Sequence, residues 1–197
     1  MAYVPVAQET PWQQSDKVDL ARCAVVVVDI LGGCEGPTPG TEAAAANAGR
    51  IVKAARAKGV SVIFSDDAHD SRFDAELELW GDHGVAGSES AQPLADFDLQ
   101  PSDIVVPKRR YSGFFQTDLD LLLRELGVRT VVAVGCDTNV CVLHTLADAY
   151  FRGYDSVLVE DATRTFLCGS QEGAVEHCRK CFGSVVASTD ELVAALA

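Results

Sequence analysis

The segment that decides the fold reads Cys23-Ala24-Val25-Val26-Val27-Val28-Asp29, an apolar run that ends at a carboxylate. Unbroken runs rich in valine are typical of strands buried on both faces of a parallel sheet, because such strands present no polar face. Further short runs of this kind occupy residues 60–66, 104–106, 130–134, 156–159 and 184–187. We therefore predict a sheet of buried strands.

Helical apolar patterns fill most of the intervals between these runs, at residues 41–58, 118–126, 140–152 and 172–181. A glycine follows each pattern, at positions 59, 127, 153 and 183, where a left-handed residue closes a helix. Strands that alternate with helices predict an α/β fold, a doubly wound parallel sheet in three layers with helices on both faces. Residues 68–102 show no clear period, and we expect this long segment to form a wall of the functional site.

Composition limits the classes of function. The 197 residues include 29 acidic and 16 basic ones, a net charge of -13, and 48% are hydrophobic. One domain over residues 1–197, with 1–20 as an N-terminal extension, suits this length. The charge argues against a nucleic-acid partner. Neither a signal peptide nor a membrane span is evident, and seven cysteines, an odd number, suit reduced thiols, so we expect a soluble cytoplasmic protein.

An acid, a lysine and a cysteine follow the predicted strands, where parallel α/β sheets bind ligands. Asp29 ends the first run, Lys108 lies just past the third, and Cys141 follows the fourth. Thr138 or Asn139 could cap a helix there, which would place the sulfur in its first turn, where free N–H groups favour a thiolate. The alternative is an ordinary buried cysteine.

Three separated motifs carry a family resemblance. They are Asp29 after the valine run, the segment VPKRRYSGFF at 106–115, and GCDTNVCV at 135–142 followed by Asp148-Ala149. Together they resemble the isochorismatase-like cysteine hydrolases, the superfamily that includes nicotinamidases and N-carbamoylsarcosine amidohydrolases. The likeness extends from about the first predicted strand to the last.

The resemblance implies a catalytic triad of Asp29, Lys108 and Cys141. In that mechanism the aspartate takes the thiol proton, the lysine balances the charge, and the thiolate attacks a carbonyl carbon. The backbone N–H groups of Asp137 and Cys141 would hold the oxyanion, with a cis peptide at Cys136-Asp137. The reaction would pass through a thioester and release ammonia or an amine.

Asp67, His69 and His83 resemble the metal ligands of metal-containing nicotinamidases, in the pieces Asp-x-His and Trp-x-x-His. One carboxylate and two imidazoles suit Zn, Fe or Mn. The other interpretation is a pair of loop histidines on a polar surface, since not every branch of the superfamily keeps a metal.

Trp80, Tyr111 and Phe114 are candidate aromatic walls for a substrate, although ordinary core packing is the alternative. Nicotinamidases usually carry a Gln two residues after the acid and a nearby Phe, and residues 30–34 offer neither. We predict a small-molecule amidase of nicotinamidase type. The alternatives are a hydrolase of acyclic amides or ureido (N-carbamoyl) compounds and a catalytically silent scaffold.

A cysteine pair, a glycine-rich segment and two histidines could indicate other functions. Cys178 and Cys181 form a C-x-x-C pair, but at the end of a late helix rather than at a redox helix start. The glycines of 31–36 do not match G-x-G-x-x-G, so no nucleotide cofactor is expected. His144 and His177 are interpreted as structural. The alanine-rich helices and the resemblance together predict a homo-oligomer.

Overall fold

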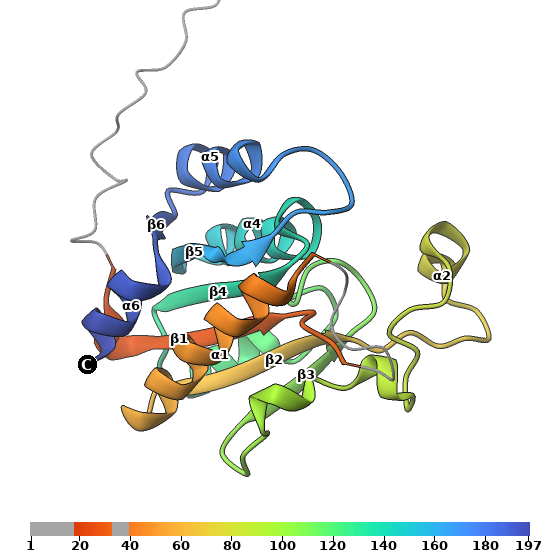
Figure 1. The fold of residues 1–197 in the computed structure, drawn as a ribbon, viewed down its shortest axis with the longest axis horizontal. Helices are drawn as coiled ribbons and strands as arrows, with labels where there is room; N and C mark the ends of the chain where they lie inside the picture. The colour runs from red at the N-terminus through yellow and green to blue at the C-terminus, as the bar shows by residue number, and fades with distance from the viewer. Residues whose placement is uncertain (1–17, 33–39) are drawn as a thin grey trace, which may run out of the picture.

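The computed structural model describes residues 18–32 and 40–197, and in this part of the chain one six-stranded sheet forms the centre (Figure 1). All paired strands are parallel, in the order β3-β2-β1-β4-β5-β6. The strands are β1 (Cys23–Val28), β2 (Ser61–Asp67), β3 (Ile104–Lys108), β4 (Thr130–Cys136), β5 (Asp155–Arg164) and β6 (Val185–Ala187). Each predicted strand is confirmed.

Helices cover both faces of the sheet, as the doubly wound prediction requires (Figure 1). One face carries α1 (Glu42–Ala57) and α6 (Thr189–Leu196), and the other carries α3 (Leu119–Glu125), α4 (Leu143–Phe151) and α5 (Gln171–Cys181). The predicted helices are confirmed, and the four glycines that follow them all have positive φ. Helix α6 was not predicted; a capping box between Ser188 and Glu191 starts it.

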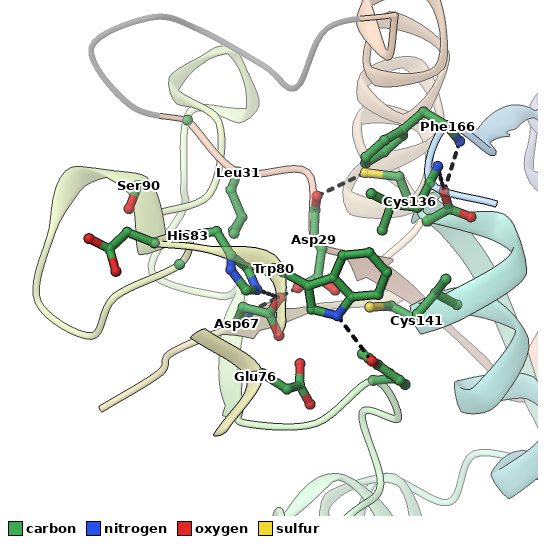
Figure 2. A pocket seen from close by; sticks show the side chains of 17 residues that line it. Asp29, Leu31, Asp67, Glu76, Trp80, His83, Ser90, Cys136, Cys141 and Phe166 are labelled. Carbon is green, nitrogen blue, oxygen red and sulfur yellow. Dashed lines mark hydrogen bonds and ion pairs between the residues drawn. The ribbon is translucent and has the colours of Figure 1, made fainter. Parts of the chain in front are cut away.

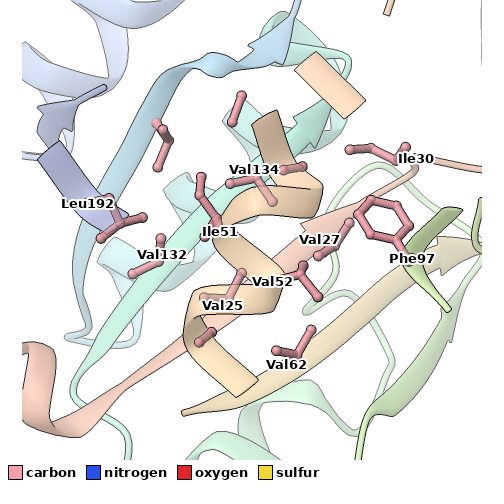
Figure 3. Packing of buried hydrophobic residues seen from close by; sticks show 14 of the residues in the cluster. Val25, Val27, Ile30, Ile51, Val52, Val62, Phe97, Val132, Val134 and Leu192 are labelled. Carbon is pink, nitrogen blue, oxygen red and sulfur yellow. The ribbon is translucent and has the colours of Figure 1, made fainter. Parts of the chain in front are cut away.

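Strand β1 divides the apolar interior into two cores, because its side chains alternate between the faces. Val25 and Val27 pack with Ile51 and Val52 of α1 (Figure 3), whereas Val26 contacts the layer of α3, α4 and α5. Every residue of β1 is buried. The unbroken valine run is thus explained by burial on both sides.

The segment 68–102 is less irregular than its sequence indicates. It contains the short helix α2 (Ala75–Trp80) and 3-10 turns at Glu89–Ala91 and Ala95–Phe97. Isolated bridges tie Leu31 to Pro93 and His69 to Val85. These contacts hold the segment over the carboxyl ends of the strands, where it forms one wall of a cavity, as predicted.

The chain extends the sheet from β1 to β2 and β3 on one side and then from β4 to β6 on the other. The order therefore reverses between β1 and β4, and ligands of open α/β sheets bind outside the strand ends at such a point. In the described part of the chain, no helix has the length and apolar character needed to cross a membrane. The predicted N-terminal extension falls almost wholly outside the described residues, as do positions 33–36 of the glycine-rich segment.

Candidate active site

A cavity of about 430 Å³ opens at the switch point between β1 and β4. Asp29, Asp67 and Cys141 line it, and one carboxylate oxygen of each aspartate and the sulfur all lie within 4.8 Å of one another. Figure 2 shows these side chains directed toward the same space as Glu76 and His83. The predicted acid and cysteine therefore meet.

Lys108, at the end of β3, joins the cluster of Asp29, Asp67 and Cys141. Its Nζ atom lies 2.7 Å from Asp29 Oδ2, donates to Asp67 Oδ1, and lies 3.7 Å from Cys141 Sγ. The sequence placed this lysine just past a strand, but it is the last residue of β3 and only 1% exposed. A fully buried ammonium needs carboxylate partners, and the two aspartates supply them.

The two aspartates differ in acidity. Burial raises the pKa of Asp29 to about 6, and Asp67 adds to the rise while Lys108 opposes it. Burial also acts to raise the pKa of Asp67, but Lys108 and His69 outweigh it and lower that pKa. The backbone N–H of Asp67 donates to Asp29 Oδ1 at 2.8 Å, which orients the Asp29 carboxylate. One carboxylate is thus held as an anion and the other is placed to take a proton.

The turn that presents Cys141 follows a cis peptide at Cys136-Asp137, as the resemblance implies. A π-helical turn, Thr138–Val142, precedes α4. Asp137 caps this turn, since its Oδ1 accepts from the Asn139 N–H at 2.7 Å; the prediction of Thr138 or Asn139 as cap is wrong. Asp137 stands one residue before the turn, which is where a cap must stand.

Burial raises the pKa of the Cys141 thiol well above its ordinary value, and Asp29 raises it further against the opposing effect of Lys108. The start of the helix was expected to favour a thiolate, and desolvation of the buried sulfur acts against that effect. The thiol needs a base, and Asp29 is the adjacent one.

Gly135 allows β4 to reach the site. Its φ is 120°, and a Cβ there would lie 2.0 Å from the carbonyl oxygen of Val28. Only glycine tolerates that approach. The thiol of the next residue, Cys136, donates to the carbonyl of Asp29 at 3.0 Å. The ends of β1 and β4 are therefore tied together directly beneath the reacting groups.

The predicted metal ligands also meet. Asp67 Oδ2 lies 3.6 Å from His69 Nε2 and 3.8 Å from His83 Nε2, and Glu76 Oε2 lies 3.9 Å from His69 Nε2. Metal–ligand bonds of about 2.0–2.2 Å produce such spacings between ligands. His69 Nε2 is buried with no hydrogen-bond partner in the described chain, while its Nδ1 faces Asp74 at 3.3 Å. These residues fit a divalent ion.

Glu76 was missed by the sequence analysis. It lies in α2, whose six residues are too few for a helical period to be visible, and the acid-rich stretch around it resembles a solvated surface. The structure turns this side chain inward, where it is 7% exposed and lines the cavity. Other lining residues that carried no sequence signal are Leu31, Ser90, Val140, Phe166 and Leu167.

Two of the three predicted aromatic walls are in place. Trp80 and Tyr111 line the cavity, and the Trp80 indole N–H donates to the Tyr111 hydroxyl at 3.0 Å. Phe114 is a correction: it is 3% exposed, packs 5.9 Å from the ring of Tyr154, and is not among the lining residues. Phe114 lies in a turn, and its side chain belongs to the core cluster that includes Leu146 and Ala149 of α4.

The rival sites are not assembled. Cys178 is buried, Cys181 is exposed, and both are free thiols. His144 Nδ1 donates to the Val140 carbonyl at 2.7 Å, and His144 is not among the lining residues of the cavity. His177 packs against a phenylalanine. Among the described residues, the candidate catalytic and metal-binding side chains meet at the switch-point cavity.

Comparison with known proteins agrees with this geometry. The isochorismatase domain matches residues 23–190. This chain belongs to the isochorismatase family. Within it, the ureidoacrylate amidohydrolase RutB of Agrobacterium fabrum is 34% identical, over 86% of this chain and 88% of that protein.

Two solved structures extend the comparison within the isochorismatase family. The N-carbamoylsarcosine amidase of Thermoplasma acidophilum superposes with a TM-score of 0.79 at 31% identity, covering 86% of this chain and 97% of that one. The nicotinamidase PncA of Bacillus subtilis superposes with a TM-score of 0.73 at 29% identity, covering 85% and 99%. Amidohydrolases that differ in substrate thus share this fold.

Proposed function

We propose that this protein is a cysteine-dependent amidohydrolase that cleaves a small uncharged amide, in the manner of a nicotinamidase, through a thioester. Its family and its relatives named amidohydrolase make it a hydrolase of carbon–nitrogen bonds other than peptide bonds. The observation that carries the finer proposal is the buried contact of Lys108 with Asp29 and Cys141 beneath the cavity.

Each residue of this cluster has a defined role in the proposed reaction. Asp29 takes the proton of the Cys141 thiol, and the sulfur attacks the amide carbon. The backbone N–H groups of Asp137 and Cys141 donate hydrogen bonds to the developing oxyanion. Asp29 then gives its proton to the leaving amine, and finally acts as base for the water that hydrolyses the thioester. Lys108 keeps its charge throughout and orients Asp29.

Asp67, His69 and His83 would hold a divalent ion such as Zn, Fe or Mn, and Glu76 is placed to join them. The lone buried Nε2 of His69 is the support for this proposal. A bound ion supplies Lewis acidity at the cavity wall, which can hold a heteroatom of the substrate. The protein's own part is to present these atoms beside the cysteine.

The charge of the cavity favours an uncharged substrate. Its described lining includes the carboxylates of Asp29, Asp67, Glu76, Asp82 and Asp137, and no lysine or arginine. Apart from the proposed ion, a substrate carboxylate would meet like charges from these side chains, and such a juxtaposition costs several kcal/mol.

Ureido compounds form the second candidate class. The curated relative at 34% identity is named for ureidoacrylate, and a close structural neighbour is named for N-carbamoylsarcosine. Both of those names denote carboxylates. The lining of this cavity disfavours them, but an uncharged urea would meet no such repulsion.

Ammonia release from a matched panel tests the proposal. The panel contains nicotinamide, ureidoacrylate and N-carbamoylsarcosine, and the protein is purified without chelator and analysed for metals. We expect nicotinamide to be turned over at least about tenfold faster than either carboxylate, which corresponds to about 1.4 kcal/mol. Cys141→Ala is the control for adventitious activity.

The outcomes separate the parts of the proposal. Faster turnover of ureidoacrylate would overturn the uncharged-substrate class while keeping the amidohydrolase. Metal-free protein that hydrolyses nicotinamide unchanged after chelation would remove the ion from the reaction. Metal-bound protein that is inert to nicotinamide would keep the metal site and remove that substrate.

A further inference from the structure

One wall of the cavity is built by a strap, residues 165–170, which links β5 to α5. Phe166 and Leu167 of the strap line the cavity, and they remain 41% and 45% exposed. Figure 2 shows Phe166 on the side of the cavity where Cys136 lies. Because apolar packing holds these two residues only in part, other contacts must set their position.

Those contacts come from the turn that presents the cysteine. Asp137 Oδ2 accepts from the backbone N–H of Phe166 at 2.8 Å and from that of Leu167 at 2.7 Å. The amide of Asn139 donates to the carbonyl of Cys168. The turn and the strap are thus joined by side chain to backbone, across about thirty residues of sequence.

Asp137 is also held firmly within its own turn. Its other oxygen, Oδ1, accepts from the Asn139 N–H, and its backbone carbonyl accepts from the N–H groups of Val140 and Val142 at 3.1 Å each. The residue is 3% exposed. Its carboxylate therefore accepts three backbone N–H bonds, two from the strap and one from the turn, and these satisfy a buried negative charge.

We infer that Asp137 is a positioning residue that couples the oxyanion-binding turn to the pocket wall. The inference rests on the proposed function, in which the backbone N–H of the same residue binds the oxyanion. A single carboxylate sets the orientation of that N–H and the position of Phe166 and Leu167. Movement of the strap by a poorly fitting substrate is thereby transmitted to the oxyanion donor, so that this residue links substrate fit to turnover.

Two substitutions of Asp137 separate its contact with the turn from its contacts with the strap. Asp137→Ser keeps a hydroxyl that caps the Asn139 N–H but is too short to reach the strap. Asp137→Ala removes both contacts. The matched control is Ser170→Ala, because the Ser170 hydroxyl at the far end of the strap accepts from the Gly173 N–H of α5 at 3.1 Å and lies outside the cavity lining.

Activity of these variants is measured on nicotinamide and on N-carbamoylsarcosine. For Asp137→Ala we expect kcat to fall about 10- to 100-fold and KM to rise, because a displaced oxyanion donor weakens transition-state binding. Asp137→Ser should raise KM with a smaller loss of kcat. Ser170→Ala should keep both KM and kcat within about threefold. A kcat for Asp137→Ala that equals that of Ser170→Ala would overturn the coupling.

Amide hydrogen exchange, followed by NMR in the absence of substrate, supplies a readout that does not depend on the proposed function. Asp137→Ala should speed exchange in both segments, at Asn139 and Cys141 as well as at Phe166 and Leu167. Ser170→Ala should speed it at Gly173 and leave Asn139 and Cys141 unchanged. If the Asp137 variant loosens the strap alone, the coupling is wrong, whatever the enzyme hydrolyses. If wild-type protein is inert to both substrates while exchange changes as expected, the proposed substrates fail and the coupling stands.

Discussion

Cys141 and Cys178 are two buried thiols in the same helical layer, and their surroundings differ completely. Both belong to the core between the sheet and helices α3, α4 and α5. Cys178 is fully buried in α5, and burial raises its pKa to about 12 with a further contribution from Cys181. Cys141 is buried as well, but beside Lys108 and Asp29.

The difference shows that burial alone disables a thiol. A buried sulfur becomes a nucleophile only where other buried groups remove its proton and balance the charge, and such groups are costly to desolvate. The sheet supplies them at the ends of β1, β2 and β3, whereas among the described residues the pKa of Cys178 is shifted only by burial and by Cys181. Three kinds of experiment test this contrast between Cys141 and Cys178: replacement of each thiol, removal of Lys108, and a change of pH.

The largest effect is expected from replacing each of the two cysteines by alanine. Cys141→Ala should lower kcat about 10³-fold or more, because the covalent step is lost. Cys178→Ala should leave kcat within about twofold and lower the free energy of unfolding by about 1–2 kcal/mol, as expected for a small cavity. Steady-state ammonia release and urea denaturation measure the two effects. Appreciable turnover by Cys141→Ala would sink the nucleophile assignment.

Removing the ammonium group of Lys108 should destabilise the folded protein, because two buried carboxylates near Cys141 lose their partner. Lys108→Met leaves the carboxylates of Asp29 and Asp67 without their partner, and we expect a loss of about 3–5 kcal/mol in the free energy of unfolding together with the loss of activity. The exposed pair of Lys180 and Glu176 supplies the control, and Lys180→Met should cause no measurable change.

A double variant sharpens this test. Combining Asp29→Asn with Lys108→Met removes one of the two unpaired carboxylates. The double variant should therefore regain part of the stability that Lys108→Met loses. Urea denaturation of all variants at one pH makes the comparison. If Lys108→Met were as stable as wild type, the ion cluster would not be the reason for the burial of this lysine.

The smallest effect is a pH dependence that belongs to Cys178. The folded state holds this thiol's proton up to a pKa of about 12, whereas the ordinary value is 9.0. The unfolded chain therefore loses the proton first, so stability declines as pH rises from about 9 toward 12. The slope for one such group approaches about 1.4 kcal/mol per pH unit. Cys178→Ala should show a shallower decline than wild type between pH 8 and 10.5, and parallel curves would contradict the assignment.

The sequence by itself determined the strands, most of the helices, the family motifs and the acid, lysine and cysteine of the candidate site. These features are visible locally, because a buried strand must be apolar throughout and because side chains that end parallel strands meet at one edge. The candidate metal ligands Asp67, His69 and His83 were identified by their resemblance to the ligands of metal-containing nicotinamidases, and the structure brings one ligand atom of each within 4.8 Å of the others.

Only the tertiary structure decided which other side chains join that site. Glu76 turns inward and Phe114 turns into the core, and neither orientation is encoded in a local pattern. Lys108 is buried because Asp67, 41 residues earlier in the chain, pairs with it, and the Asp137 carboxylate meets Phe166 across 29 residues. A side chain's charge state and direction depend on partners that folding brings within hydrogen-bond distance, so no sequence window contains that information.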